Sequence, residues 1–461
     1  MDAFLRALGR FVFSSFFRRI EIVGQNKIPN TGPVVIVANH FNSLVDGAIL
    51  TTYLPRMPRF LAASIVLRHR TVVPILRAAG SIPVFRHQDA EGSISQTRET
   101  IRKTADLLAA GGVLATFPEG RSHNEPSVQP VKSGTARIIL EAEQSHGPLG
   151  VKIVPVGLVF EEKSRIRSRV LIQIGEPFDA SDMVSVYSSG VPADRAAAVR
   201  ALTERIQDGL SAISPNFGSW KLAHQIERVA GIWERKKLRL PKRAAPFDAF
   251  RRRQAFGKGY EWLRVHYPSS VEDIRRKVIE YESQLGTAHP EQDEIGPGFP
   301  AAGGLWFAVR SLLALFVGFP ILIAGLALNA LPYFTSVLMS RRADPDQQAT
   351  WQIFSGVVLF PLFWLLQAVL IGWTVSNLFS SIAAGLITFA AALPAQPVSG
   401  RLCLWYIDLC KRLIHGLRIW MWKRTHRTQA RQLDQLRQSI AEKVVALMAL
   451  YETRRKKTPA E

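Results

Sequence analysis

Two kinds of apolar pattern alternate along residues 20–180 of the chain. Short continuous apolar runs are typical of strands buried on both faces of a sheet, and they occur at 20–23, 34–38, 81–85, 112–117, 153–160 and 170–174. Stretches with apolar residues at helical spacing lie between them, at 46–54, 93–110 and 134–143. This alternation predicts one compact α/β domain over residues 20–180.

Residues 1–19 form a separate amphipathic pattern. Phe4, Leu8 and Phe11 fall at helical spacing, with Arg6 and Arg10 among them. We expect a helix that lies in a membrane interface or packs on the core of the domain. The two arginines interrupt the apolar centre that a signal peptide needs, so we expect no signal peptide.

Residues 181–300 are richer in basic residues. A regular amphipathic helix is predicted at 192–213, and Arg- and Lys-rich helical segments with interleaved aromatics follow it. We interpret this part as a helical accessory region that ends in a linker rich in Pro and Gly. It either lies along lipid headgroups or presents an ordinary solvated basic face.

Two long runs without charged residues, 311–340 and 347–400, predict a transmembrane region over residues 305–400. A basic tail follows at 401–461, and the positive-inside rule places it in the cytoplasm. The first half of the chain is expected on the same side, which requires an even number of spans. We therefore favour two spans, near 311–335 and 353–375, with 377–394 re-entrant or packed; three spans are the alternative.

The net charge of +21 implies an anionic partner. Basic clusters beside apolar spans favour anionic membrane lipids over nucleic acid, for which no recognised motif is present. The cysteines, Cys403 and Cys410, do not have the spacing of a metal site or a redox pair. We expect neither a metal nor a disulfide framework.

A candidate general base stands at the end of the apolar run 34–38. Asn39 and His40 follow that run, and Asp46 comes six residues after the histidine. The ends of buried strands are where α/β folds place their sites, and a carboxylate can fix one imidazole nitrogen while the other accepts a proton. A helix does not bring residues six apart onto one face, so contact requires a turn near Asn42-Ser43.

Three further segments suggest an anion site. The run 112–117 leads into Pro118-Glu119-Gly120-Arg121-Ser122, where glycine permits close backbone approach and arginine can bind phosphate in bidentate fashion. The segment 80–86 has the same form, from Gly80 to Arg86. Lys132 precedes a helix whose N-terminus can help to bind an anion.

These segments occur in a specific order: Asn39-His40 with Asp46, then Gly80 to Arg86, then Pro118-Glu119-Gly120, then an apolar segment around Pro155. The chain resembles the phospholipid/glycerol acyltransferase family over roughly residues 20–180. The resemblance implies a mixed-sheet α/β domain with flanking helices, which uses acyl-CoA or acyl-carrier protein as co-substrate and binds no cofactor.

The resemblance also implies a role for each matched residue. His40 would be the catalytic base and Asp46 its partner. The acceptor, a phosphate-bearing glycerol, would be bound by six residues: Arg86, Glu119, Gly120, Arg121, Ser122 and Lys132. Four others would support the site structurally: Asn39, Gly80, Pro118 and Pro155.

The spacing of His40 and Asp46 is one residue longer than the family's usual His-x4-Asp. This variant, with the run 119–134 and the C-terminal apolar segments, is similar to the yeast glycerol-3-phosphate/dihydroxyacetone-phosphate acyltransferase branch. We therefore expect an integral-membrane enzyme with its catalytic domain on the cytoplasmic face, at the inner membrane in a bacterium. It would acylate glycerol 3-phosphate or its 1-acyl form. The alternatives are another lysophospholipid or amine-lipid acceptor, or a non-catalytic lipid-binding protein.

Overall fold

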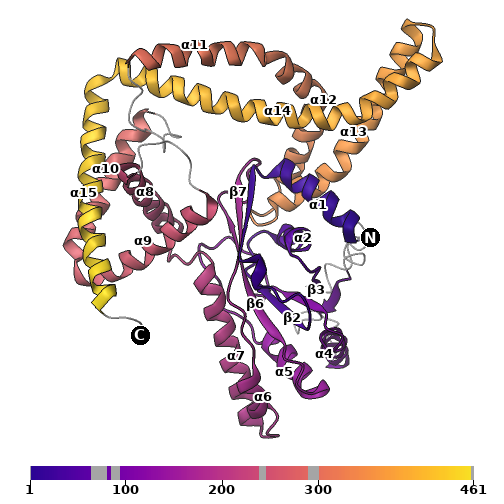
Figure 1. Cartoon of the computed structure of the whole chain (residues 1–461), viewed down its shortest axis with the longest axis vertical. Coiled ribbons are helices and arrows are strands. Elements are labelled where there is room, and N and C mark those ends of the chain that lie inside the picture. The colour runs from indigo at the N-terminus through magenta and orange to yellow at the C-terminus, as the bar shows by residue number, and fades with distance from the viewer. Residues whose placement is uncertain (1, 64–79, 85–93, 238–244, 289–300, 458–461) are drawn as a thin grey trace. The chain divides into compact units, whose positions relative to one another are not determined.

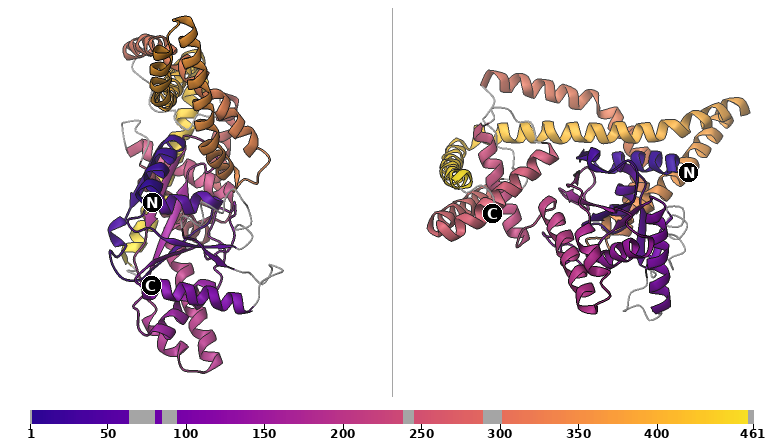
Figure 2. Two further views of the ribbon diagram at one scale, coloured as in Figure 1. Left: turned by 90° about the vertical axis from the view of Figure 1, so that its right-hand side faces the viewer. Right: turned by 60° about the horizontal axis from the view of Figure 1, so that its bottom comes forward.

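A seven-stranded sheet organises the first compact unit of the protein (Figures 1 and 2). The computed structural model describes residues 2–63, 80–84, 94–237, 245–288 and 301–457. All neighbouring strands pair in parallel except β6 and β7, which are antiparallel, so the predicted mixed sheet is confirmed. In spatial order the strands are β1 (Arg19–Val23), β7 (Arg169–Ile174), β6 (Lys152–Phe160), β2 (Val34–Ala38), β5 (Val113–Thr116), β3 (Arg59–Ala63) and β4 (Ile82–Val84).

All six predicted strands are present, with ends that differ by no more than one residue within the described part of the chain. Strand β3 was not predicted, because its sequence, Arg59-Phe60-Leu61-Ala62-Ala63, is short and begins with a charged residue. β3 lies between β5 and β4 and forms its backbone hydrogen bonds with these two strands.

The central strand β2 is buried on both faces, as its continuous apolar run predicts. Successive side chains of a strand point to opposite faces. Val34, Ile36 and Ala38 enter one core cluster, and Val35 and Val37 enter the other.

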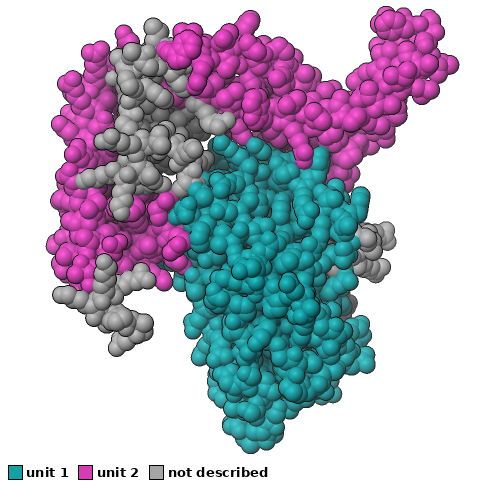
Figure 3. Space-filling view, viewed as in Figure 1, with its two compact units in different colours: residues 1–219, 245–250, 343–353 teal, residues 220–244, 251–342, 354–461 magenta. Residues whose placement is uncertain are grey.

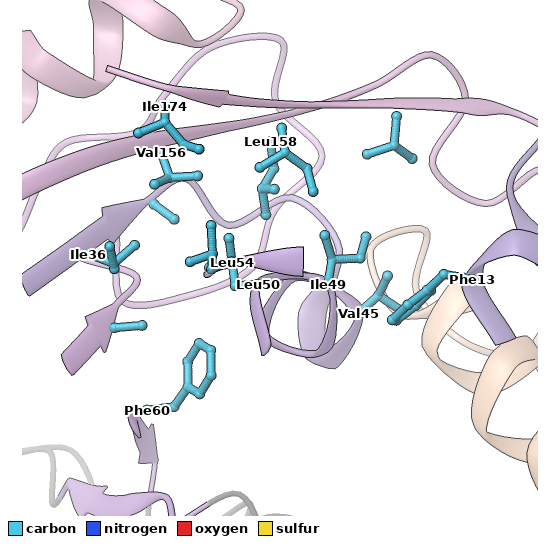
Figure 4. Packing of buried hydrophobic residues seen from close by; sticks show 14 of the residues in the cluster. Phe13, Ile36, Val45, Ile49, Leu50, Leu54, Phe60, Val156, Leu158 and Ile174 are labelled. Carbon is cyan, nitrogen blue, oxygen red and sulfur yellow. The ribbon is translucent and has the colours of Figure 1, made fainter. Parts of the chain in front are cut away.

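Helices cover each face of this sheet (Figure 1). On the first face lie α1 (Asp2–Phe16) and α2 (Ser43–Tyr53), and Figure 4 shows Ile49 and Leu50 of α2 in this core with Ile36 of β2. The second face packs against α4 (Ile94–Ala109), α5 (Gly134–His146), α6 (Ser181–Tyr187) and α7 (Pro192–Ile213). A short 3₁₀ helix, η1 (Gln25–Lys27), follows β1.

The first unit extends past the predicted domain boundary at residue 180. It comprises residues 1–219, 245–250 and 343–353 (Figure 3). The extension to 219 has a clear cause, because α7 buries Leu202, Ile206 and Leu210 in the second core cluster. The segment Ala343–Ile353 joins because Ala349 and Ile353 are buried in the first one.

Helix α1 resolves the two alternatives for the N-terminus in part. Phe13 and Phe16 are buried in the first core cluster, and Arg6 donates a 2.8 Å hydrogen bond to the carbonyl of Leu54. The helix therefore packs on the domain. Phe4, on the other hand, is 70% exposed, so part of the apolar surface of α1 faces outward.

The second unit is helical. Its basic accessory helices pack with the tail helix, and a small apolar cavity among them is lined in part by Leu222, Phe256, Val278 and Val444. The accessory region and the end of the basic tail thus form one bundle. These helices are α8 (Trp220–Lys237), α9 (Pro246–His266, which starts in the first unit), α10 (Pro268–Ala288) and α15 (Arg427–Lys457).

Three helices of the described chain are long and apolar enough to cross a membrane: α12 (Phe319–Ser340), α13 (Gln348–Leu378) and residues 382–418 of α14 (Ile382–Thr425). Residues 377–394, predicted to be re-entrant or packed, form the end of α13 and the start of α14, which continues without a break to Thr425. The first apolar run is also divided, since α11 (Ala301–Val317) ends before Gly318 and α12 begins after it. Many apolar side chains on these helices are exposed, for example Phe334 at 62% and Ile387 at 70%, as lipid-facing residues are.

Candidate active site

The candidate base leaves the sheet at the carboxyl end of β2, beside the end of the parallel strand β5. Asn39 continues the pairing with β6 through its side chain. Its amide nitrogen donates to the carbonyl of Leu158 at 2.9 Å, and its amide oxygen accepts from the Leu158 N–H at 2.6 Å. These two bonds fix the point at which the chain turns away, and His40 is the next residue.

A turn then brings His40 and Asp46 together. Nδ1 of His40 lies 3.0 Å from Oδ2 of Asp46, and the Asn42 N–H donates to the same carboxylate oxygen at 2.7 Å. Helix α2 starts at Ser43, three residues before Asp46, and Ser43 has a positive φ of 46°. The turn that the six-residue spacing requires is therefore present, with its backbone strain located at Ser43.

The environment of the pair differs between its two members. The Asp46 side chain is fully buried, whereas the His40 side chain remains 19% exposed. Burial raises the pKa of Asp46, and the hydrogen bond from His40 opposes this rise. The His40 ring stacks on Phe117 at a centroid distance of 4.2 Å, so its orientation is fixed by both a carboxylate and an aromatic face.

Glu119 lies in the turn after β5 and binds the loop that carries His40. Its Oε2 accepts from the backbone N–H of His40 at 2.9 Å and lies 3.0 Å from Nε2 of His123; its Oε1 accepts from the N–H of Gln129 at 3.1 Å. The carboxylate is buried, and both oxygens bind protein groups. Glu119 therefore joins the β2 and β5 loops, and no local sequence pattern predicts this contact.

Gly120, Arg121 and Lys132 lie in or beside the same turn. Gly120 has φ of +77°, and a Cβ there would lie 2.8 Å from Nζ of Lys132. The carbonyl of Pro118 accepts from the Lys132 N–H at 2.8 Å, which draws Lys132 to the turn. The side chains of Arg121 and Lys132 are exposed and available to an anion.

The remaining predicted residues fall into two groups. Arg86 lies outside the described residues. Gly80 has φ of +64° and sits against the Arg59 side chain, where a Cβ would overlap the guanidinium. Pro155 is buried in β6, with its Cγ 3.1 Å from where a Cβ on Gly209 of α7 would lie. Gly80 and Pro155 are therefore packed against other parts of the domain, which fits the structural role predicted for them.

Two residues near the site were missed from sequence. Lys163 donates from Nζ to the carbonyl of Phe41 at 2.7 Å and to that of His123 at 3.0 Å. Asp346 accepts a hydrogen bond from the Ser122 hydroxyl. No local motif marks either residue, since their partners are far away in sequence. Within the described residues, no group of three His, Cys, Asp or Glu side chains is arranged to hold a metal ion.

Comparison with known proteins gives a consistent family assignment. The acyltransferase family profile matches residues 19–159. The chain is 24% identical over 469 residues to glycerol-3-phosphate O-acyltransferase 1 of Saccharomyces cerevisiae, covering 78% of this chain and 60% of that protein. It is 28% identical over 185 residues to glycerol-3-phosphate O-acyltransferase 2 of the same yeast, covering 39% and 24%.

Among solved structures, the 1-acyl-sn-glycerophosphate acyltransferase of Thermotoga maritima aligns with 46% of this chain and 80% of its own, at 20% identity and a TM-score of 0.33. The chain spans less than two thirds of the length of the two yeast relatives. The predicted family and branch agree with the sequence matches. The chain therefore carries, over residues 19–159, a domain of the acyltransferase family.

Proposed function

We propose that the protein is a membrane-bound O-acyltransferase that moves a fatty acyl group from a thioester to a hydroxyl of glycerol 3-phosphate or 1-acylglycerol 3-phosphate. The observation that carries this proposal is the His40–Asp46 pair, with 3.0 Å between Nδ1 and Oδ2 at the end of β2. The yeast relatives support the choice of acceptor, since both are named glycerol-3-phosphate O-acyltransferases.

The chemistry follows from the orientation of His40. Asp46 accepts a hydrogen bond from the protonated Nδ1, which leaves Nε2 as the proton acceptor. Nε2 removes the proton of the acceptor hydroxyl as its oxygen attacks the thioester carbonyl. A tetrahedral intermediate forms, its C–S bond breaks, and the leaving thiolate takes the proton from His40, which gives an ester and a free thiol. A positioned base contributes about 10²–10⁴-fold to such a step.

Binding of the acceptor phosphate needs cations beside this base. Arg121 and Lys132 are exposed near Gly120, in the loop whose Glu119 binds the backbone of His40. We assign the phosphate to these two residues together with Arg86, whose role comes from the family resemblance. Arginine suits this task because its planar donors match phosphate oxygens.

The donor and the membrane complete the proposal. The acyl donor would be acyl-CoA or acyl-carrier protein, with no bound cofactor. The apolar helices α12, α13 and α14 would hold the protein in the bilayer, and the net charge of +21 suits anionic lipids. The catalytic domain would face the cytoplasm.

The test is an assay of membranes that contain the full chain, with labelled acyl-CoA or acyl-carrier protein and a panel of acceptors. The panel includes glycerol 3-phosphate, 1-acylglycerol 3-phosphate, other lysophospholipids and an amine lipid. We expect the fastest transfer to the first two and none by His40→Ala. Faster transfer to another acceptor would replace the proposed substrate. Equal product from wild type and His40→Ala would refute the catalytic role, and no transfer at all would favour a lipid-binding protein.

A further inference from the structure

The connection between two apolar helices belongs to the catalytic unit. Residues Ala343–Ile353, which end the link from α12 and begin α13, group with the acyltransferase domain and not with the helices that flank them. Ala349 and Ile353 are buried in the first core cluster, which also contains Val45 and Ile49 of α2. Thr350 donates from Oγ1 to the carbonyl of Asn42 at 3.4 Å, so the segment reaches the turn between His40 and Asp46.

Asp346 is the charged residue of this segment that contacts the site. It is half-buried, and its carboxylate accepts a hydrogen bond from the hydroxyl of Ser122. Ser122 follows Arg121 in the turn after β5. A charged acceptor strengthens such a bond relative to a neutral one.

Lys163 extends this contact to the loop of His40. Its ammonium group bonds to the carbonyls of Phe41 and His123, and so holds the β2 loop against the β5 loop. Burial lowers the pKa of Lys163, while the charges of Asp346 and Asp46 oppose that change. Asp346 therefore stabilises the charged form of the lysine that joins the two loops.

We propose that Asp346 is a positioning residue for acyl transfer, which acts through Ser122 and Lys163 to fix the loops that carry His40 and Glu119. The inference rests on the proposed function and adds to it a part of the chain outside the family domain. Asp346 does not contact His40, so its effect is on the placement of the base.

The same contacts have a consequence for membrane topology. Because Ala343–Ile353 packs in the catalytic unit, that segment and the catalytic domain lie on one side of any membrane that α12 and α13 cross. The predicted two-span arrangement puts residues 341–347 on the opposite side, so the packing of this segment argues against that arrangement.

The experiment compares four variants of the full chain in membranes: Asp346→Asn, Ser122→Ala, the double variant, and Asp344→Asn as a matched control. Asp344 is an exposed carboxylate in the same connection. We expect Asp346→Asn to lower kcat about ten-fold with little change in KM, on the scale of one charge-assisted hydrogen bond. Ser122→Ala should also lower kcat, and the double variant should be no slower than Asp346→Asn. Asp344→Asn should match wild type.

Equal kcat for Asp346→Asn and Asp344→Asn, in a wild-type chain that does transfer acyl groups, would overturn the inference and leave the proposed function intact. If the wild-type chain transfers no acyl group, the proposed function is refuted and the kinetic comparison does not test the role of Asp346. The contact is then tested by thermal unfolding of the same four variants, where additive effects of the two single substitutions would overturn it.

Thiol labelling does not depend on activity and leaves Asp346 in place. It tests whether the Asp346 segment lies on the same side of the membrane as the catalytic domain, which the contact requires. In a chain with Cys403→Ser and Cys410→Ser, Ala343→Cys and Ser145→Cys are treated with an impermeant thiol reagent in sealed vesicles. Ser145 is exposed on α5 of the catalytic domain. We expect both positions to be labelled from the same side, and labelling from opposite sides would overturn the inference.

Discussion

Nδ1 of His40 and Oδ2 of Asp46 lie 3.0 Å apart although the two residues are six positions apart in the chain. The contact forms because Asp46 stands in the first turn of α2, where its carboxylate also accepts from the backbone N–H of Asn42. An acidic side chain is favoured at this end of a helix. The extra residue relative to the usual family spacing is thus accommodated in the turn before α2.

Loss of either member of this pair should reduce kcat. His40→Ala removes the base, with an expected loss of about 10²–10⁴-fold. Asp46→Asn leaves the imidazole in place but no longer favours the Nδ1-protonated tautomer, so a smaller loss is expected. Because both residues serve one proton transfer, we expect the double variant to be no slower than His40→Ala in steady-state assays. Additive losses in the double variant would show that the two residues act separately.

Glu119→Gln should lower kcat more than it changes the KM of the acceptor. The carboxylate accepts from the backbone N–H groups of His40 and Gln129, and an amide offers one acceptor oxygen in place of two. One buried donor is then left without a partner, which costs about 1–3 kcal/mol. Steady-state kinetics and thermal unfolding measure the two effects. Glu125→Gln, at an exposed position in the same loop, is the control, and an acceptor KM that rises while kcat holds would contradict the positioning role.

Arg86→Ala should raise the KM of a phosphate-bearing acceptor and leave kcat nearly unchanged. Arg86 lies outside the described residues, so its assignment comes from the family resemblance. Removal of one charged hydrogen-bond partner predicts a KM increase of about 10-fold or more. The comparison is Arg102→Ala, at an exposed position on α4, which should keep the wild-type KM. Equal KM values for the two variants would remove Arg86 from the phosphate site.

Acid stability should depend on Asp179, which lies beside the second core cluster. Hydrogen bonds from Lys152 and Ser181 lower the pKa of Asp179 from 3.8 to about 2. A carboxyl whose pKa is lower in the folded than in the unfolded state stabilises the fold above pH 3.8, and this contribution is lost as the pH falls toward about 2. Asp179→Asn should lack that decline.

The decline can be measured from unfolding midpoints of the detergent-solubilised chain at pH steps between 4.5 and 2. Asp208→Asn removes an exposed carboxylate of α7 and serves as the control. If wild type and Asp179→Asn have parallel profiles over this range, the ion pair with Lys152 contributes nothing to stability.

Local sequence was sufficient for most of the sheet. The continuous apolar run 34–38 predicted a strand buried on both faces, and β2 is one, because only a central strand can bury both sets of alternating side chains. β3 was not predicted, because its apolar run, Phe60-Leu61-Ala62-Ala63, is too short to distinguish a strand from a helix, and its pairing partners β4 and β5 lie farther along the chain. The number of apolar helices also required the structure, because a charge-free run does not reveal where a helix breaks, as at Gly318.

At the site, the residues that could be predicted are those whose partners are near in the chain or that belong to an ordered family pattern. His40, Asp46 and the turn from Pro118 to Ser122 are of this kind, because strand ends and glycine turns have local signatures. The fold was needed to find that Glu119 binds the backbone of His40, and that Lys163 and Asp346 contact the same loops. Hydrogen bonds between residues so far apart in sequence depend on the packing of the whole unit, and no short stretch of sequence specifies them.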